Sequence, residues 1–364
     1  MFKKIIFLFL ILSFFNLFTP IVKAATEASY FKARVIKILQ ENKKVSDNRE
    51  FTQQNLLLEA LTGELKGQQI EYRGISDIEV VDVVAYKAGE LVWVSESTGA
   101  NDEKIFTITD SVRSGKLLWL TLFFCLLVVI IGGFKGFKSL LSLLLSFIVI
   151  IKLLIPNILA GGNPVFWGVV GAFLIMLAII YLTDGFNRRS HLAVLSITIV
   201  LVIIYSLSFV FSDWLRLSGL AEEASFLIAL GLGNIDFRGL LLAGFVIGAV
   251  GVLDDIVVGQ IESVRQLKLT DKTTPKYQLF TSAYQVGKAH LGAIINTLFL
   301  TYAGSSLLLL ILFSVGQEPF LSFSRVIDNE MIATEIARTL VGSIGVVLSL
   351  PIATGLAVFL LKEK

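Results

Sequence analysis

The sequence predicts an all-α multi-pass membrane bundle of about seven transmembrane helices, preceded by a small N-terminal extracytoplasmic domain built as an OB-like or SH3-like β-barrel. Of 364 residues, 55% are apolar and only 16% are charged, whereas soluble domains carry roughly 25% charged residues. Apolar runs of about the ~20 residues that cross a bilayer recur after Lys116. The one long polar stretch lies before them and alternates as strands do.

The chain begins like a secreted protein. Lys3 and Lys4 precede an apolar run, and the small residue Ala24 closes a pattern suited to cleavage. We therefore expect residues 1–24 to be a signal peptide and the mature chain to start outside the cytoplasm. An uncleaved signal anchor has the same features and is the alternative, and both place residue 30 on the outer side.

Residues 25–112 are expected to form the extracytoplasmic domain. Period-two runs such as 31–36 and 91–95 indicate half-buried strands, separated by glycine-containing and polar breaks. Five or six such strands would close a small barrel. The segment has no cysteine and no histidine, and we find no catalytic constellation in it. Binding of a protein partner by this domain belongs to the alternative function given below.

Residues 113–364 are expected to form the transmembrane helical domain. A short apolar piece, 226–232, is too brief to span and either re-enters or lies at the interface. Lys and Arg concentrate in the short segments that seven crossings place inside, which fits the positive-inside rule with the C-terminus in the cytoplasm. The predicted crossings are about 117–134, 138–156, 164–183, 192–211, 238–258, 290–315 and 337–361.

The fifth predicted crossing carries the most informative pattern. Gly244, Gly248, Gly251 and Asp255 are spaced by four, three and four residues and therefore share one helix face. Small residues at this spacing are typical of closely packed membrane helices. We expect a tight seam that buries the carboxylate of Asp255 among protein.

An acid in this position is costly, by at least ~2.5 kcal/mol, and persists mostly where it serves an ion or proton path. Glu262 lies on nearly the same face, while Asp254 is rotated by about 100° and shares its face with Arg265. The alternative is that both aspartates mark the cytoplasmic end of the helix and sit in headgroup water.

The sixth and seventh crossings add polar and small residues at helical spacing, including Asn296 and Thr297 and then Arg338 with Gly342 and Gly345. An interhelical hydrogen bond is the alternative role of Asn296, and simple packing is that of the glycines. The candidate ion or substrate path comprises Asp254, Asp255, Glu262, Asn296, Thr297 and Arg338. The candidate packing residues are Gly244, Gly248, Gly251, Gly342 and Gly345.

Several functions are not expected. A formal net charge of +2 without a basic aromatic surface argues against nucleic-acid binding. Two histidines and the single Cys125 make a metal centre improbable, and we expect no cofactor. Adjacent aspartates on one helix point in different directions and cannot share a proton, so we do not expect an enzyme.

Three blocks of this sequence resemble the YibE/F family of predicted multi-pass bacterial membrane proteins. Residues 234–260 include Gly-Val-Leu-Asp-Asp at 251–255, similar to a motif of that family. The other two blocks are 287–304, which starts Gly-Lys-Ala-His, and 335–351, which starts Glu-Ile-Ala-Arg. The resemblance covers most of the mature chain and implies its fold and membrane location more than an activity.

This chain departs from the family pattern at several positions, including three within the blocks and Leu307 or Leu308, where a proline is common in the family. Ala289 stands where the family often has an acid, and Val257 and Gly259 stand where it often has threonines. These departures weaken any role for such groups in binding a substrate.

The leading functional hypothesis is a permease or channel-like transporter in the lipid bilayer, coupled to protons or cations, for an unspecified small ion or solute. The alternative is a non-transporting membrane scaffold or sensor that acts through its outer domain. A glycine seam serves packing within and between chains alike, so the sequence leaves the oligomeric state open.

Overall fold

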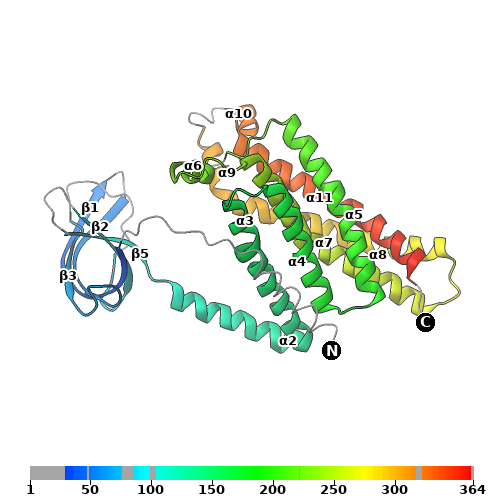
Figure 1. The fold of residues 1–364 in the computed structure, drawn as a ribbon, viewed down its shortest axis with the longest axis horizontal. Helices are drawn as coiled ribbons and strands as arrows, with labels where there is room; N and C mark the ends of the chain where they lie inside the picture. The colour runs from blue at the N-terminus through cyan, green and yellow to red at the C-terminus, as the bar shows by residue number, and fades with distance from the viewer. Residues whose placement is uncertain are drawn as a thin grey trace. The chain divides into compact units, whose positions relative to one another are not determined.

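The computed structural model describes residues 29–46, 49–75, 85–98, 104–220, 222–316 and 322–361. The predicted signal peptide, residues 1–24, lies outside them. The chain divides into two compact units, one spanning Lys23–Leu127 and the other containing Val128–Lys364. Figure 1 shows the strands gathered in the first unit and most of the helices in the second.

The first unit is an antiparallel sheet with the strand order β3-β2-β1-β4-β5. The long first strand pairs with β2 on one side and with β4 on the other, as in Val35 opposite Leu58 and Phe31 opposite Val94. The edge strands β3 and β5 come into contact, so the sheet curls into a half-barrel. The strands are β1 Ser29–Ser46, β2 Arg49–Ala60, β3 Gln69–Arg73, β4 Leu91–Thr98 and β5 Lys104–Ser111.

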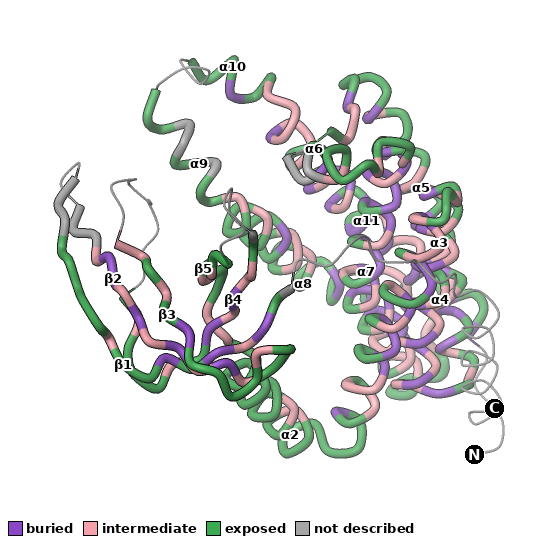
Figure 2. The backbone as a smooth tube through the Cα atoms, turned by 60° about the vertical axis from the view of Figure 1, so that its left-hand side comes forward, coloured by how far each residue is buried: buried purple, intermediate pink, exposed green. Residues whose placement is uncertain are grey.

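Alternating side chains fill this half-barrel. Phe31, Ala33 and Val35 on β1 are at most 1% exposed, as are Val92 and Val94 on β4, because residues two apart point to one face of a strand. Figure 2 shows buried and exposed positions alternating along the strands. The predicted strand character of this region is confirmed, with a half-barrel sheet of five strands among the described residues.

The second unit is almost entirely helical. A π-helical stretch, Val149–Leu154, joins α2 to α3. The helices are α2 Ser114–Ile148, α3 Ile155–Leu159, α4 Pro164–Thr183, α5 Arg188–Trp214, α6 Glu222–Ala229, α7 Phe237–Thr270, α8 Lys276–Ser305, α9 Leu307–Ser314, α10 Phe323–Asp328 and α11 Glu330–Leu360.

Five of these helical segments are long and apolar enough to cross a membrane, judged over the described part of the chain. They are Ser114–Leu159, Pro164–Thr183, Arg188–Trp214, Phe237–Thr270 and Glu330–Leu360. Two predicted crossings, 117–134 and 138–156, fall within the first of these, and its backbone leaves helical geometry at Gly133 (φ 54°, ψ −139°). The predicted crossing 290–315 is divided between α8 and α9 at Ser306. The short piece 226–232 overlaps α6.

Helix α7 lies at the centre of the bundle, where α4, α5, α8 and α11 all contact it (Figure 1). Its buried face carries large apolar side chains such as Leu253, Val257 and Ile261. The Asn and Asp residues before α4, α5 and α7 cap their first turns, as in Asp236 accepting from the backbone N–H of Gly239.

A capped turn holds α8 beside α7. Asp271, which follows α7, accepts hydrogen bonds from the Thr273 hydroxyl (2.6 Å) and backbone N–H (2.8 Å) and from the Thr274 hydroxyl (2.9 Å). These hydrogen bonds hold the pKa of Asp271 below its ordinary value. Pro275 then precedes α8, a position where a missing N–H costs nothing.

Small residues set close approaches within the bundle, but of two such contacts, at Gly168 and Gly345, only the second involves a glycine that spacing predicted. A Cβ added at Gly168 of α4 would overlap Ala243 of α7, and one added at Gly345 of α11 would overlap Ile204 of α5. In contrast, a Cβ at Gly244, Gly251 or Gly342 would meet nothing within 4 Å. Of the five predicted packing glycines, Gly345 makes the tightest contact.

We expect Gly168→Ala to destabilise the bundle by about 1–3 kcal/mol, because the added methyl must push α4 away from the backbone of α7. Gly251→Ala is the matched control on α7 and should be neutral or gain up to ~1 kcal/mol from helix propensity. Denaturant unfolding of both variants in lipid–detergent micelles measures the difference. Equal stabilities would contradict the close α4–α7 approach.

Candidate functional site

The predicted glycine stripe of α7 faces open space. Gly244, Gly248, Gly251 and Asp255 do share one face, and all four are exposed. The nearest group is the Tyr302 hydroxyl of α8, which is 3.6 Å from the position of a Cβ at Gly248. The predicted burial of Asp255 in a tight seam is therefore wrong, because the helices that contact α7 cover its other sides.

The two adjacent acids have different surroundings. Asp255 is exposed on the open face, whereas Asp254 is half-buried. Its Oδ1 atom is buried and has no hydrogen-bond partner among the described residues. Arg265, which spacing places on the same face as Asp254, donates to Glu262 instead (2.8 Å). An unpaired buried oxygen is costly, so Asp254 is the less satisfied of the two acids.

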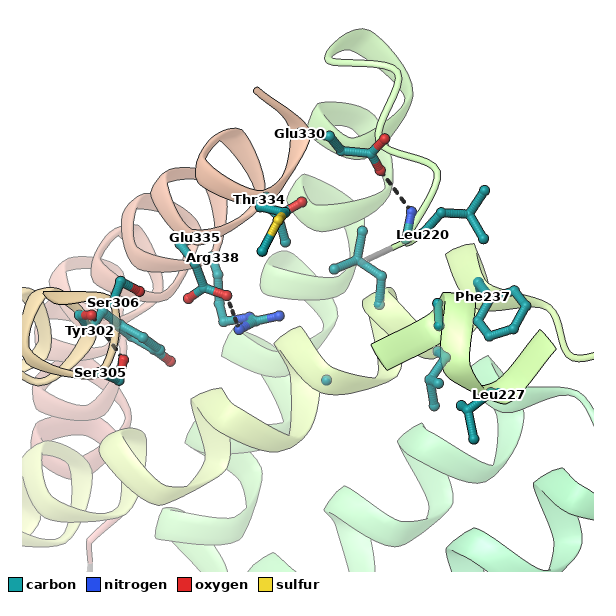
Figure 3. Close-up of a pocket in the computed structure, with 16 residues that line it drawn as sticks. Leu220, Leu227, Phe237, Tyr302, Ser305, Ser306, Glu330, Thr334, Glu335 and Arg338 are labelled. Carbon is teal, nitrogen blue, oxygen red and sulfur yellow. Dashed lines mark hydrogen bonds and ion pairs between the residues drawn. The ribbon is translucent and has the colours of Figure 1, made fainter. Parts of the chain in front are cut away.

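A cavity of about 500 Å³ opens at the end of the bundle where α7 and α11 begin (Figure 3). Arg338 and Glu335 point into it from α11, joined by a 2.6 Å hydrogen bond. Gly244, the first residue of the open stripe, lines its wall. We call this the outer cavity, after the side on which the sequence prediction places this end of α7. Its other lining residues include Leu220, Leu227, Phe237, Leu240, Leu241, Tyr302, Ser305, Ser306, Glu330 and Thr334.

A small void of about 10 Å³ lies one turn deeper, close to the volume that holds one water molecule. Arg338, Tyr302 and Gly248 are among its lining residues. The guanidinium of Arg338 also lies over the Phe245 ring, 5.5 Å from its centroid. Arg338 and Tyr302 therefore form a polar neck below the outer cavity.

A second cavity of about 390 Å³, which we call the inner cavity, lies toward the other end of α7. Two ion pairs cross it: Lys135 with Asp184 at 3.2 Å, and Arg189 with Glu262 at 2.7 Å. Ser190 lines it as well, and its hydroxyl is buried without a partner among the described residues. Gly259 brings the open stripe of α7 to its wall. Glu262 is thus paired and is not a free acid.

Gln260 ties three helices together below the acids. Its side-chain amide donates to the Ala283 carbonyl of α8 and to the Thr354 hydroxyl of α11, both at 2.8 Å. The side chain is 3% exposed, and a Cβ at Gly287 would overlap it. Its apolar neighbours in the sequence give no sign of this role, and only its place in the motif blocks could have drawn attention to it.

The comparison that decides the family is a match over residues 120–363 to the family described as YibE/F-like protein. The chain belongs to the YibE/F-like family. The resemblance based on the three sequence blocks is confirmed, and the matched region includes both cavities and the acids between them. No curated protein and no solved structure matches the chain.

The remaining predicted path residues of this YibE/F-like protein divide between two positions. Arg338 lines the outer cavity, but Asn296 and Thr297 are exposed on α8. Asn296 lies three residues past Ala293, and Thr297 donates to the Ala293 carbonyl of its own helix (2.9 Å). The structure therefore places Arg338 at the cavity where the open face of α7 begins and Asp255 further along that face, with Asp254 half-buried beside it.

We expect replacing Gln260 by Met, which is similar in size, to destabilise the YibE/F-like bundle by about 0.5–1.5 kcal/mol, the range of hydrogen bonds between membrane helices. Gln278→Met, at an exposed position near the start of α8, is the control. Thermal unfolding in micelles measures both. No loss at Gln260 would mean that the amide does not hold α8 and α11 to α7.

Proposed function

We propose that this YibE/F-like protein is a channel-like transporter or permease that moves protons or small cations along the open face of α7. The observation that carries the proposal is the continuity of that face: it begins at Gly244 in the outer cavity, passes Asp255, and ends at Gly259 in the inner cavity. Cavities at both ends of a membrane helix with acids between them are what ion transport requires.

The proposal includes a topology in the bacterial cytoplasmic membrane with the half-barrel domain outside and the C-terminus inside. As a straight helix, the 46 residues of Ser114–Leu159 would be about 69 Å long, more than twice the ~30 Å core. The break at Gly133 supports two crossings there, and we infer a further one from α8 with α9. Seven crossings then place Arg189 and Arg265 inside, as the positive-inside rule favours.

The ion pairs along α7 support a choice of the groups that bind the ion. At the inner cavity Lys135 forms an ion pair with Asp184, while Arg189 and Arg265 both form ion pairs with Glu262. At the outer cavity Arg338 matches Glu335. Among the described residues, no cation pairs with Asp254 or Asp255, so these two carboxylates are the ones that can take up a proton or a small cation.

Each acid has a separate role in this mechanism. Asp255, exposed on the open face, receives the ion from the water that covers this face. Asp254, whose buried oxygen lacks a partner, binds it more tightly, because a bound proton or cation removes the cost of an unpaired charge in a low-dielectric environment. The inner cavity, which the Lys135–Asp184 pair lines, lies further along α7 from Asp254, so we expect release toward that cavity.

The presence of water along the open face of α7 can be tested without knowing the substrate. In a Cys125→Ser background, we expect Gly251→Cys to react with a small hydrophilic thiol reagent at least about tenfold faster than Val347→Cys, because only a hydrated thiol ionises readily. Val347 is an exposed apolar position on α11 outside the described cavities. Equal reaction rates would mean that the open face of α7 is not hydrated.

The acids are tested by ion flux in proteoliposomes under an imposed pH or cation gradient. We expect Asp254→Asn to abolish the pH dependence of the flux and Asp255→Asn to slow the flux, because a carboxamide neither releases a proton nor binds a cation strongly. Asp328→Asn, which changes an exposed acid at the end of α10, is the control. Unchanged flux in both α7 variants would refute the proposal, and absence of flux in the wild type would favour a scaffold or sensor acting through the outer domain.

A further inference from the structure

An apolar groove opens sideways from the outer cavity. The groove has a volume of about 200 Å³ and lies between α11 and the pair α8–α9. Tyr302, Ser306 and Glu335 line both the groove and the outer cavity, so the two spaces adjoin. The other groove residues are Phe299, Ala303, Leu310, Ile332, Ile336, Thr339 and Leu340.

The groove is apolar where a hydrocarbon chain would lie. On α11, Leu340 lies one to two turns further from the start of the helix than Glu335 does. On α8, Phe299 lies about one turn further from the end of the helix than Tyr302 does. The groove therefore extends from the helix ends toward the middle of the bundle. Phe299, Ile336 and Leu340 are 43%, 41% and 47% exposed, so a chain from the surrounding bilayer can reach them.

The outer cavity offers a charged pair at the mouth of this groove. Arg338 Nη1 donates to Glu335 Oε1 (2.6 Å), and the two side chains keep 29% and 27% of their surface exposed. The carboxylate of Glu330 is already engaged, since it accepts from the backbone N–H groups of Ser218 and Gly219 and from the Ser218 hydroxyl. Arg338 and Glu335 therefore present one positive and one negative charge side by side.

We propose that the outer cavity and the groove together bind one zwitterionic phospholipid from the bilayer. The phosphate lies at the guanidinium of Arg338, the headgroup ammonium lies at the carboxylate of Glu335, and one acyl chain fills the groove between α8 and α11. Guanidinium groups favour phosphate oxygens, and a headgroup that carries both charges leaves neither member of the pair unmatched. This inference goes beyond the ion path, because it concerns binding and requires no flux.

Retention of lipid through detergent exchange tests the proposal. The full chain is extracted from vesicles of an equimolar mixture of dioleoyl phosphatidylethanolamine and dioleoyl phosphatidylglycerol, and native mass spectrometry counts each phospholipid bound to the chain. We expect one lipid on the wild type and about tenfold weaker binding, equivalent to ~1.4 kcal/mol, in Leu340→Trp, whose indole fills the groove. Val347→Trp is the matched control, since Val347 has a similar exposure of 42% on the same helix and should retain the lipid.

Two further comparisons separate the head from the chain. Glu335→Gln should lose preference for phosphatidylethanolamine over phosphatidylglycerol, which lacks the ammonium. Glycerophosphoethanolamine, the headgroup without chains, should not displace the lipid at equal concentration. The proposal is overturned if Leu340→Trp retains lipid as well as Val347→Trp does, if the free headgroup competes equally, or if the wild type retains no lipid.

Discussion

A carboxylate in the interior of a membrane must be paired, neutralised or wet, and the arrangement around α7 follows from that constraint. Glu262 and Asp184 near the inner end are paired with cations, as is Glu335 at the outer end. Asp254 and Asp255 lie between these ends without a cation among the described residues. The constraint therefore singles out the middle of α7 as the place where the protein itself leaves charge to be balanced by water or an ion.

The glycines of the bundle serve two opposite purposes. Gly168 and Gly345 allow neighbouring helices to approach until no side chain would fit between them, which holds α4 on α7 and α11 on α5. Gly244 and Gly251 keep a strip of α7 free of side chains where no described helix covers it. Close packing on the covered sides of α7 fixes the position of the strip that stays open. Glycine therefore contributes both to the rigidity of the bundle and to access to α7.

The sequence predicted the fold better than it predicted the site. Hydropathy located Pro164–Thr183 to the residue, because length and apolarity alone decide a membrane helix, and strand alternation found the sheet of the first unit. Spacing correctly placed Gly244, Gly248, Gly251 and Asp255 on one face. It could not tell whether that face is covered, since periodicity fixes directions within a helix and not which neighbours surround it. The hydrogen bonds of Gln260 to α8 and α11 could not be predicted from the sequence for the same reason.

An uncovered face is easier to reconcile with water than with lipid. Facing hydrocarbon, Asp255 would cost at least ~2.5 kcal/mol, and the glycines beside it would leave space that acyl chains pack poorly. Water that covers the open face and continues into the cavities at both ends hydrates Asp255 and removes this cost. The glycines then have a use as well, because the absence of side chains makes room for the water. The acids and the glycines of α7 then have a single explanation, whereas a lipid-facing strip would require a separate one for each.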